Sequence, residues 1–265
     1  MAVIDPDAAQ RDVFVLAEHY DPGPGHWHAH RRAQLIHASE GVLQVHSDAG
    51  QWIVPPQRAV WVPPQVWHRV SSSRAYWLRT LYAEPQRVPV PDQCTVVSVD
   101  LLVDELLRAA AHFGPDYPQA GSEARLIAVI LDRVPHLVRA PLHLPRPSDP
   151  RLARIVDTLL ADPADATTLN QWAEQVGATA RTIARLFLRD TGLSFAQWRQ
   201  QRRLLAALVL LGAGDSVTNV ALDVGYADVS SFVAVFKEAL GETPARYFRD
   251  PPSGLDHKRA QRQSR

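Results

Sequence analysis

The sequence has a single cysteine, a single methionine and no apolar run long enough to span a bilayer. Because Cys94 stands alone, an internal disulfide, a thiolate zinc cluster and a Cys-X-X-Cys redox pair are excluded. A membrane-spanning helix needs about 20 consecutive apolar residues, and the N-terminus carries early acids in place of a basic segment with an apolar stretch. We therefore expect a cytoplasmic protein with no membrane partner, in which any bound metal uses ligands other than thiolates.

The chain also lacks net charge, because 28 basic residues balance 28 acidic ones. Residues 1–150 nevertheless hold 13 basic and 16 acidic side chains, whereas residues 151–265 hold 15 and 12, and the basic ones are mostly arginine. Arginine suits phosphate groups and guanine edges. A surplus of three charges is also within the scatter of ordinary domains, so charge permits nucleic-acid binding without establishing it.

The chain is long enough for two domains, and its contents of apolar (46%) and charged (21%) residues lie in the range of globular proteins. Residues 1–97 carry short alternating apolar runs interrupted by Pro and Gly, which predict strands of a small barrel or sandwich. Residues 98–139 predict two helices, which either form a dimer contact or cover the barrel. Their apolar residues recur at helical spacing: Leu102, Leu106 and Ala109, then Leu126, Ile130 and Val134.

The rest of the chain predicts a linker, a helical domain and a tail. Four prolines in residues 140–150 predict a linker without regular packing. Residues 151–250 carry helical patterns almost throughout. Residues 251–265 are polar and basic, which predicts disorder.

Two segments of the helical domain, residues 168–192 and 216–241, repeat one plan. In each, a capped helix ends in Ala-X-X-X-Gly, at Gly177 and at Gly225, and a second capped helix follows the turn. This repeat predicts two helix-turn-helix units. Residues 195–211 between them predict one continuous helix about 25 Å long. Such a strut could hold both second helices on successive major-groove faces, which lie about 34 Å apart.

The second helix of each unit is the candidate DNA-binding element, because its exposed N-terminal side chains reach base edges in the major groove. A plain helical bundle with solvated arginines is the alternative. Arginines on the strut, Arg199, Arg202 and Arg203, are candidates for phosphate contacts. The candidate DNA-binding residues of the two units are Thr179, Arg181, Thr182 and Arg185, then Asp228, Ser230, Ser231 and Lys237.

Residues 151–250 resemble the AraC/XylS family of transcription regulators, above all in the run VGYADVSSFVAVFKEALGETPARY. By this resemblance, Arg181 and Arg185 stand where the first recognition helix contacts bases, and Ser230 and Ser231 stand where the second does. Many members of the family have Arg where this chain has Ala234. The resemblance therefore implies weaker and more backbone-driven base readout by the second unit.

The N-terminal segment GPGHWHAHRRAQLIHASEGV resembles cupin motifs, in which two histidines, a glutamate and a later histidine bind a divalent metal inside a double-stranded β-helix barrel. By that resemblance the ligands are His28, His30, Gln34 and His68, and zinc, nickel, iron and copper are the candidate metals. Gln34 replaces the glutamate, and a neutral amide is a poorer ligand. A metal-free polar pocket and surface histidines without a role remain alternatives. We expect His26, His37 and His46, which fall outside the spacing, to be surface or structural residues.

Tryptophans are frequent in the N-terminal half. Trp52, Trp61 and Trp67, with Trp27, predict either an aromatic effector cavity at the barrel mouth or ordinary core packing. Both interpretations fit the sequence.

These features together predict an α+β multidomain fold, with an N-terminal cupin barrel and a C-terminal all-α domain holding two helix-turn-helix units. The predicted function is sequence-specific regulation of transcription by a homodimer on double-stranded DNA, controlled by a small-molecule effector or a metal in the barrel. The rival is a metal-dependent cupin enzyme, a dioxygenase or isomerase, with an appended helical domain. That enzyme needs an activated metal with open sites, and the motif lacks its glutamate.

Overall fold

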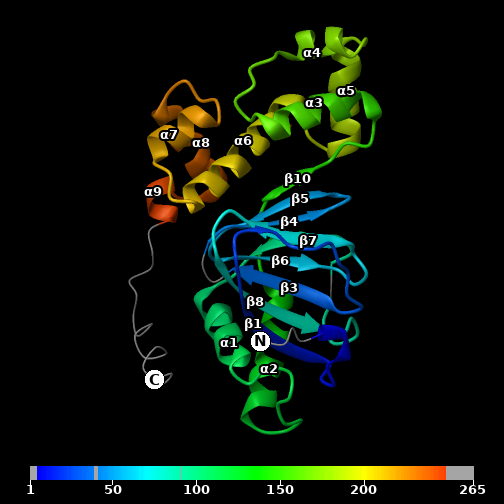
Figure 1. Cartoon of the computed structure of the whole chain (residues 1–265), viewed down its shortest axis with the longest axis vertical. Helices are drawn as coiled ribbons and strands as arrows, with labels where there is room; N and C mark the ends of the chain where they lie inside the picture. The colour runs from blue at the N-terminus through cyan, green and yellow to red at the C-terminus, as the bar shows by residue number, and fades with distance from the viewer. Residues whose placement is uncertain (1–4, 39–40, 90, 249–265) are drawn as a thin grey trace.

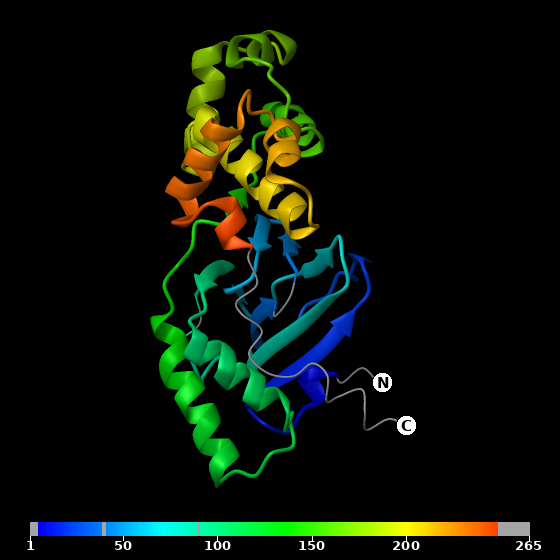
Figure 2. The same ribbon diagram turned by 90° about the vertical axis from the view of Figure 1, so that its left-hand side faces the viewer.

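The chain folds into a β domain with two flanking helices and a helical domain beyond it (Figures 1 and 2). The computed structural model describes residues 5–38, 41–89 and 91–248. The tail predicted for residues 251–265 lies outside these ranges. The predicted fold class is confirmed, because two antiparallel sheets precede an all-helical C-terminal domain.

The β domain consists of two five-stranded antiparallel sheets, with strand orders β1-β8-β3-β6-β9 and β10-β5-β4-β7-β2. Side chains of the two sheets share one apolar core, to which β3 contributes Ile36 and β4 contributes Val45. A short 3-10 helix, Pro6–Ala8, precedes the sheets. The strands are β1 (Val13–Tyr20), β2 (Gly23–Pro24), β3 (Ala33–Ala38), β4 (Leu43–Ser47), β5 (Gly50–Val54), β6 (Arg58–Val62), β7 (His68–Ser72), β8 (Tyr76–Ala83), β9 (Thr95–Ser98) and β10 (His143–Pro145).

Alternation along β4 decides which side chains face the core. Leu43 and Val45 are buried, whereas Gln44 and His46 are only partly buried, because successive side chains of a strand point to opposite faces. Proline pairs follow β5 and β6 directly, as expected of residues that cannot donate a ladder hydrogen bond.

Two helices, α1 (Leu101–Ala111) and α2 (Ser122–Arg133), followed by the 3-10 turn Val134–His136, cover the first sheet. The buried side chains of α1 are Val103, Leu107 and Ala110. Leu102, Leu106 and Ala109, whose spacing indicates the helix, each lie one residue before a buried position, and Leu102 is 51% exposed. Spacing alone does not fix the phase of a helix that carries leucines on both sides. In α2 Ile130 and Ile127 are buried, whereas Leu126 is only partly buried.

The segment expected to be an irregular linker contains strand β10, which pairs with β5 through His143↔Trp52 and Leu144↔Gln51. Leu142 and Leu144 are buried. The two leucines supply the alternating apolar pattern of a short edge strand, and the surrounding prolines obscure it. The helical domain is therefore attached directly to the edge of the second sheet.

The helical domain has the predicted helix-turn-helix repeat at the two ends of the long helix α6 (Figure 1). Gly177 and Gly225 adopt φ angles of 66° and 87°, as the turns require. A Cβ on Gly225 would also lie 2.8 Å from Ala164 Cα. The helices are α3 (Pro150–Ala161), α4 (Leu169–Gln175), α5 (Ala180–Thr191), α6 (Phe195–Gly212), α7 (Val217–Asp223), α8 (Val229–Leu240) and α9 (Pro244–Tyr247).

Candidate functional site

The first predicted recognition helix, α5, is amphipathic in the way that DNA binding requires. Its N-cap Thr179 accepts a hydrogen bond from the backbone N–H of Thr182, and the two hydroxyls lie 2.9 Å apart. Ile183, Leu186 and Phe187 are buried, as expected from the sequence. Arg181 and Arg185 are exposed and lie one turn apart, so both project from the same face of the helix.

The second predicted recognition helix, α8, begins in the same way. Asp228 accepts hydrogen bonds from the backbone N–H of Ser231 at 2.8 Å and from its hydroxyl at 2.7 Å. These bonds hold the pKa of Asp228 below its usual value. Ser230 and Lys237 are exposed. Asp228 and Ser231 bind each other, whereas Ser230 and Lys237 have side chains that point to solvent with no such bond among the described residues.

The arginines of the strut α6 differ from expectation, because they bind the helical domain itself. Arg202 donates from Nη2 to the carbonyl oxygen of Leu160 at 2.7 Å, and burial lowers the pKa of its guanidinium. Arg199 donates to Thr167 O, and Arg203 donates to Pro163 O and Gly225 O. We therefore remove Arg202 from the DNA-binding surface. The sequence shows that these residues are basic, but not whether their side chains point to solvent or into the helical domain.

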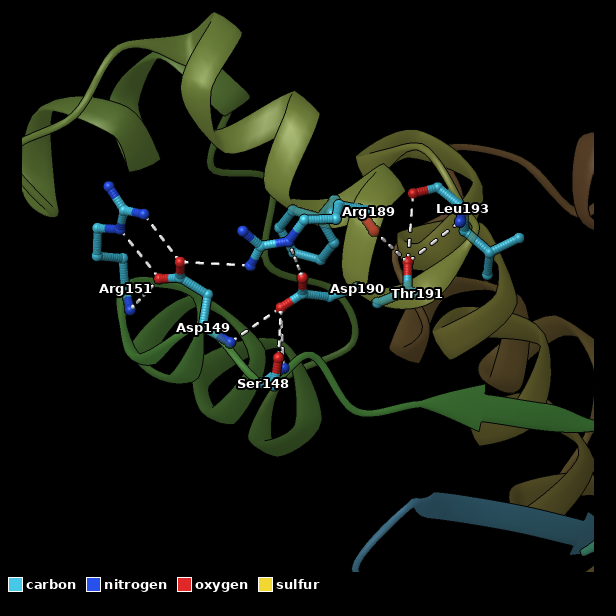
Figure 3. A network of polar contacts seen from close by, with 8 residues as sticks. Ser148, Asp149, Arg151, Arg189, Asp190, Thr191 and Leu193 are labelled. Carbon is cyan, nitrogen blue, oxygen red and sulfur yellow. Dashed lines mark hydrogen bonds and ion pairs between the residues drawn. The ribbon is translucent and has the colours of Figure 1, made fainter. Parts of the chain in front are cut away.

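A polar network ties the entry of the helical domain to the end of α5 (Figure 3). Asp190 accepts hydrogen bonds from the backbone N–H groups of Ser148 and Asp149, at 3.0 and 2.9 Å, and from the Ser148 hydroxyl at 2.9 Å. It also pairs with Arg189 at 2.6 Å. Sequence reasoning missed this network, because its members lie about forty residues apart along the chain.

Within the β domain, the structure brings together the three histidines predicted as metal ligands. The ring of His28 lies 4.4 Å from that of His68 and 4.9 Å from that of His30, centroid to centroid. The fourth predicted ligand, Gln34, is 3% exposed and lies on the core-facing side of β3 that also carries Ile36. Tyr82 packs edge-on against His30. The cupin-type spacing thus identifies a real cluster, which we call the histidine cluster (His28, His30 and His68).

Two members of the histidine cluster have lowered pKa values, and one of their ring nitrogens has no partner among the described residues. Burial lowers the pKa of His68 to about 4, and burial together with His28 lowers that of His30. Burial likewise raises the pKa of Tyr82. Among the described residues, Nε2 of His68 has no hydrogen-bond partner. Buried polar atoms in native proteins usually have partners, so this atom marks a place where a polar ligand could bind.

The same residues do not fit a metal ion as they are arranged. Across residues 5–38, 41–89 and 91–248, no three His, Cys, Asp or Glu side chains are placed to hold one metal. Gln34 brings no charge to the set. Nδ1 of His28 donates to His26 O and Nδ1 of His68 donates to Val66 O, so the Nε2 atoms are the remaining polar positions.

The three tryptophans predicted to line an effector pocket are scattered. Trp52 and Trp61 are fully buried in the two cores, and Trp52 donates its indole N–H to Cys94 O. Trp67 is 53% exposed. None of them lines the cavity beside Arg11 and Tyr117 or the cavity beside Arg69 and Arg202. His37 is structural, since it bonds Arg58 O and Asp104, which also pairs with Arg79.

Comparison with known proteins identifies the class to which these two domains belong. Residues 13–115 match the model of the AraC-like ligand binding domain, and residues 172–250 match that of a helix-turn-helix domain. The chain is 37% identical over 220 residues to the HTH-type transcriptional regulator NimR of Escherichia coli, covering 83% of this chain and 81% of NimR. The chain therefore belongs to the AraC family of transcription regulators, and the enzyme alternative is set aside.

Other relatives share parts of the chain. The regulator RipA of Corynebacterium glutamicum is 39% identical over 116 residues, or 44% of this chain and 33% of RipA. Among solved structures, ToxT of Vibrio cholerae is 11% identical, covers 89% of this chain and 96% of ToxT, and has a TM-score of 0.38. The C-terminal domain of AraT of Geobacillus stearothermophilus is 25% identical over 43% of this chain, with a TM-score of 0.37.

The chain is thus a DNA-binding transcription regulator with an N-terminal ligand-binding domain. In the part of the chain that the structure describes, no helix has the length and apolar character needed to cross a bilayer.

Proposed function

We propose that the protein binds one DNA duplex with α5 and α8 in neighbouring major grooves, and that a small polar molecule at the histidine cluster controls this binding. The observation that carries the proposal is the matched construction of the two helices. Each starts at a side-chain cap, buries an apolar face and leaves polar side chains on its exposed face. The 18-residue helix α6, about 27 Å long, lies between the two units, and successive major-groove faces lie about 34 Å apart.

The first unit carries most of the base readout in this proposal. Arg181 and Arg185 can each form two parallel hydrogen bonds to guanine, which is the commonest specific contact in the major groove. Ser230 and Lys237 on α8 are better suited to phosphates and to shorter contacts. Each mismatched base pair opposite α5 should therefore cost more affinity than one opposite α8.

The effector proposal rests on the unpartnered Nε2 atom of His68 in the histidine cluster. A molecule that satisfies this atom gains a hydrogen bond that the protein alone does not make. Such a ligand changes DNA binding only if it favours one arrangement of the protein over another. A divalent metal is the alternative occupant.

We further propose that the regulator acts as a homodimer through α1 and α2. Leu101 and Leu102 on α1 and Val129 on α2 are 77%, 51% and 43% exposed, which leaves apolar side chains on the outer side of this helix pair. The inner side covers the first sheet. The same helix pair can therefore both cover the β domain and form a dimer contact.

Selection of bound sites from random duplex DNA, with and without a chelator, tests the proposal. We expect one enriched motif under both conditions, containing two blocks one helical turn apart. Enrichment only without chelator would replace the polar effector by a metal. No enrichment under either condition would refute sequence-specific binding.

A further inference from the structure

A second candidate ligand site lies between the two domains. A cavity of about 590 Å³ separates the outer face of the second sheet from the helical domain, a size suited to a small organic ligand. The sheet contributes Gln44, His46, Gln51 and Arg69. The helices contribute Val156 and Leu160 of α3 and Trp198 and Arg202 of α6. We call this space the interdomain cavity; the histidine cluster does not line it.

Two arginines of the interdomain cavity form no ion pair in the described ranges, although the carboxylate of Asp162 favours the charged form of Arg202 from a longer distance. Within the described ranges neither Arg69 nor Arg202 pairs with a carboxylate, and the Nε atom of each is buried without an acceptor. Arg69 lies over the ring of Trp27, 5.1 Å from its centroid. Arg202 makes a single hydrogen bond, to Leu160 O. A buried cation without a partner is costly, so these two guanidinium groups favour an anion.

The remaining charges of the cavity do not supply that anion. Arg146 is already paired with Asp157 at 2.9 Å. Asp48 is exposed and pairs with neither Arg69 nor Arg202. His46 stays neutral near pH 7, because burial and the charge of Arg69 lower its pKa to about 4. The cavity therefore carries a net positive charge with two guanidinium groups available.

The other walls are apolar, which narrows the ligand class. Leu144, Val156 and Trp198 line the cavity but are almost fully buried, so the apolar surface open to a ligand belongs to Leu160, which is partly buried, and to the exposed indole ring of Trp27. Inorganic phosphate would satisfy the arginines but would leave Leu160 and Trp27 in contact with water. An anion with an apolar body satisfies both, because the carboxylate accepts two parallel hydrogen bonds from an arginine and the body buries apolar surface.

We propose that the interdomain cavity binds a small organic carboxylate with an apolar or aromatic body, held by Arg69 of the β domain and Arg202 of the helical domain. This site is separate from the effector site at the histidine cluster, and neither depends on the other. Because the ligand contacts both domains, it stabilises the arrangement in which they face each other as described here. By linkage, it changes the affinity for DNA by the same factor by which DNA changes its own affinity.

Calorimetric titration of the full chain with biphenyl-4-carboxylate and with the neutral biphenyl-4-carboxamide tests the site. We expect the carboxylate to bind at least tenfold more tightly than the amide. Arg69→Gln and Arg202→Gln should each weaken carboxylate binding about tenfold or more, and should leave amide binding within about twofold. Arg154→Gln on the exposed side of α3, which removes the same charge outside the cavity, should leave both unchanged.

Arg69→Gln keeps the test decisive if Arg202→Gln unfolds the protein, because the side chain of Arg69 forms no hydrogen bond with the protein among the described residues. Absence of carboxylate binding by the unmodified chain would overturn the proposal. Equal binding of acid and amide, or carboxylate binding unchanged in Arg69→Gln, would overturn it as well. None of these outcomes affects the proposed DNA binding or the histidine cluster, which site selection tests separately.

Discussion

The indole N–H of Trp198 in α6 donates a hydrogen bond to the carbonyl oxygen of Pro145 in β10, at 2.8 Å. Trp198 is completely buried, and β10 is an edge strand of the second sheet. This bond therefore joins the strut between the two helix-turn-helix units to the β domain. A ligand that moves the edge of the sheet would therefore also move α6, to which both DNA-binding units are attached.

Trp198→Phe removes this bond and leaves Pro145 O without its donor. We expect the free energy of unfolding to fall by about 1 to 3 kcal/mol, as measured by urea denaturation. Trp172→Phe is the matched control, because Trp172 is equally buried but its indole N–H has no acceptor among the described residues. A loss in Trp172→Phe as large as in Trp198→Phe would show that ring packing, and not the hydrogen bond, stabilises this contact.

Close approach between Gly212 at the end of α6 and Val42 of the β domain predicts a second interdomain effect. A Cβ on Gly212 would lie 2.2 Å from Cγ2 of Val42. Gly212→Ala should therefore destabilise the protein by about 1 to 3 kcal/mol although alanine favours helices. Adding Val42→Ala should recover part of the loss, as the coupling energy of a double-mutant cycle would show. Strictly additive losses would contradict this contact.

Asp190 holds the entry of the helical domain through two backbone N–H groups and one hydroxyl (Figure 3). These donors and Arg189 hold the pKa of Asp190 well below its usual value. Asp190→Ala should free residues 146–151, so that trypsin cleaves at Arg146 and Arg151 several times faster. Asp223→Ala, an exposed carboxylate on α7, serves as the control. Unchanged cleavage in Asp190→Ala would mean that the network does not restrain this segment.

The stability of the β domain should depend on pH through His46. Burial and Arg69 lower the pKa of this residue from 6.5 to about 4. Between these values the unfolded chain binds the proton and the folded chain does not, so stability is full above about pH 6.5 and is lost as the pH falls toward 4. His46→Gln should reduce the loss between pH 7 and 5 by about 1 kcal/mol, after allowance for solvent screening. His136→Gln, an exposed histidine, should have no such effect; equal pH profiles for wild type and His46→Gln would contradict the assignment.

Local features were predictable from the sequence. The caps Thr179 and Asp228 and the turns at Gly177 and Gly225 depend on neighbouring residues only, and each lies where the sequence places it. The histidine cluster was also predictable, because its histidines have the spacing of a cupin motif, and the histidines of such a motif lie close together in the folded domain.

Features that depend on distant contacts were not predictable. The inward turn of Arg202 toward Leu160, the pairing of β10 with β5 and the interdomain cavity all require knowledge of how the two domains meet. Composition and periodicity contain no such information. The buried face of α1 was not predictable for a related reason, because contact with the first sheet decides which of its leucines are buried.

The central claim is that α5 and α8 occupy neighbouring major grooves, and hydroxyl-radical footprinting on a selected site tests it most directly. We predict two protected blocks about 10 base pairs apart. Arg185→Ala should weaken binding by about 1 to 3 kcal/mol and relax sequence preference in one block only, whereas Ser230→Ala should affect only the other. A single protected block, or loss of preference in both blocks with Arg185→Ala, would contradict the claim.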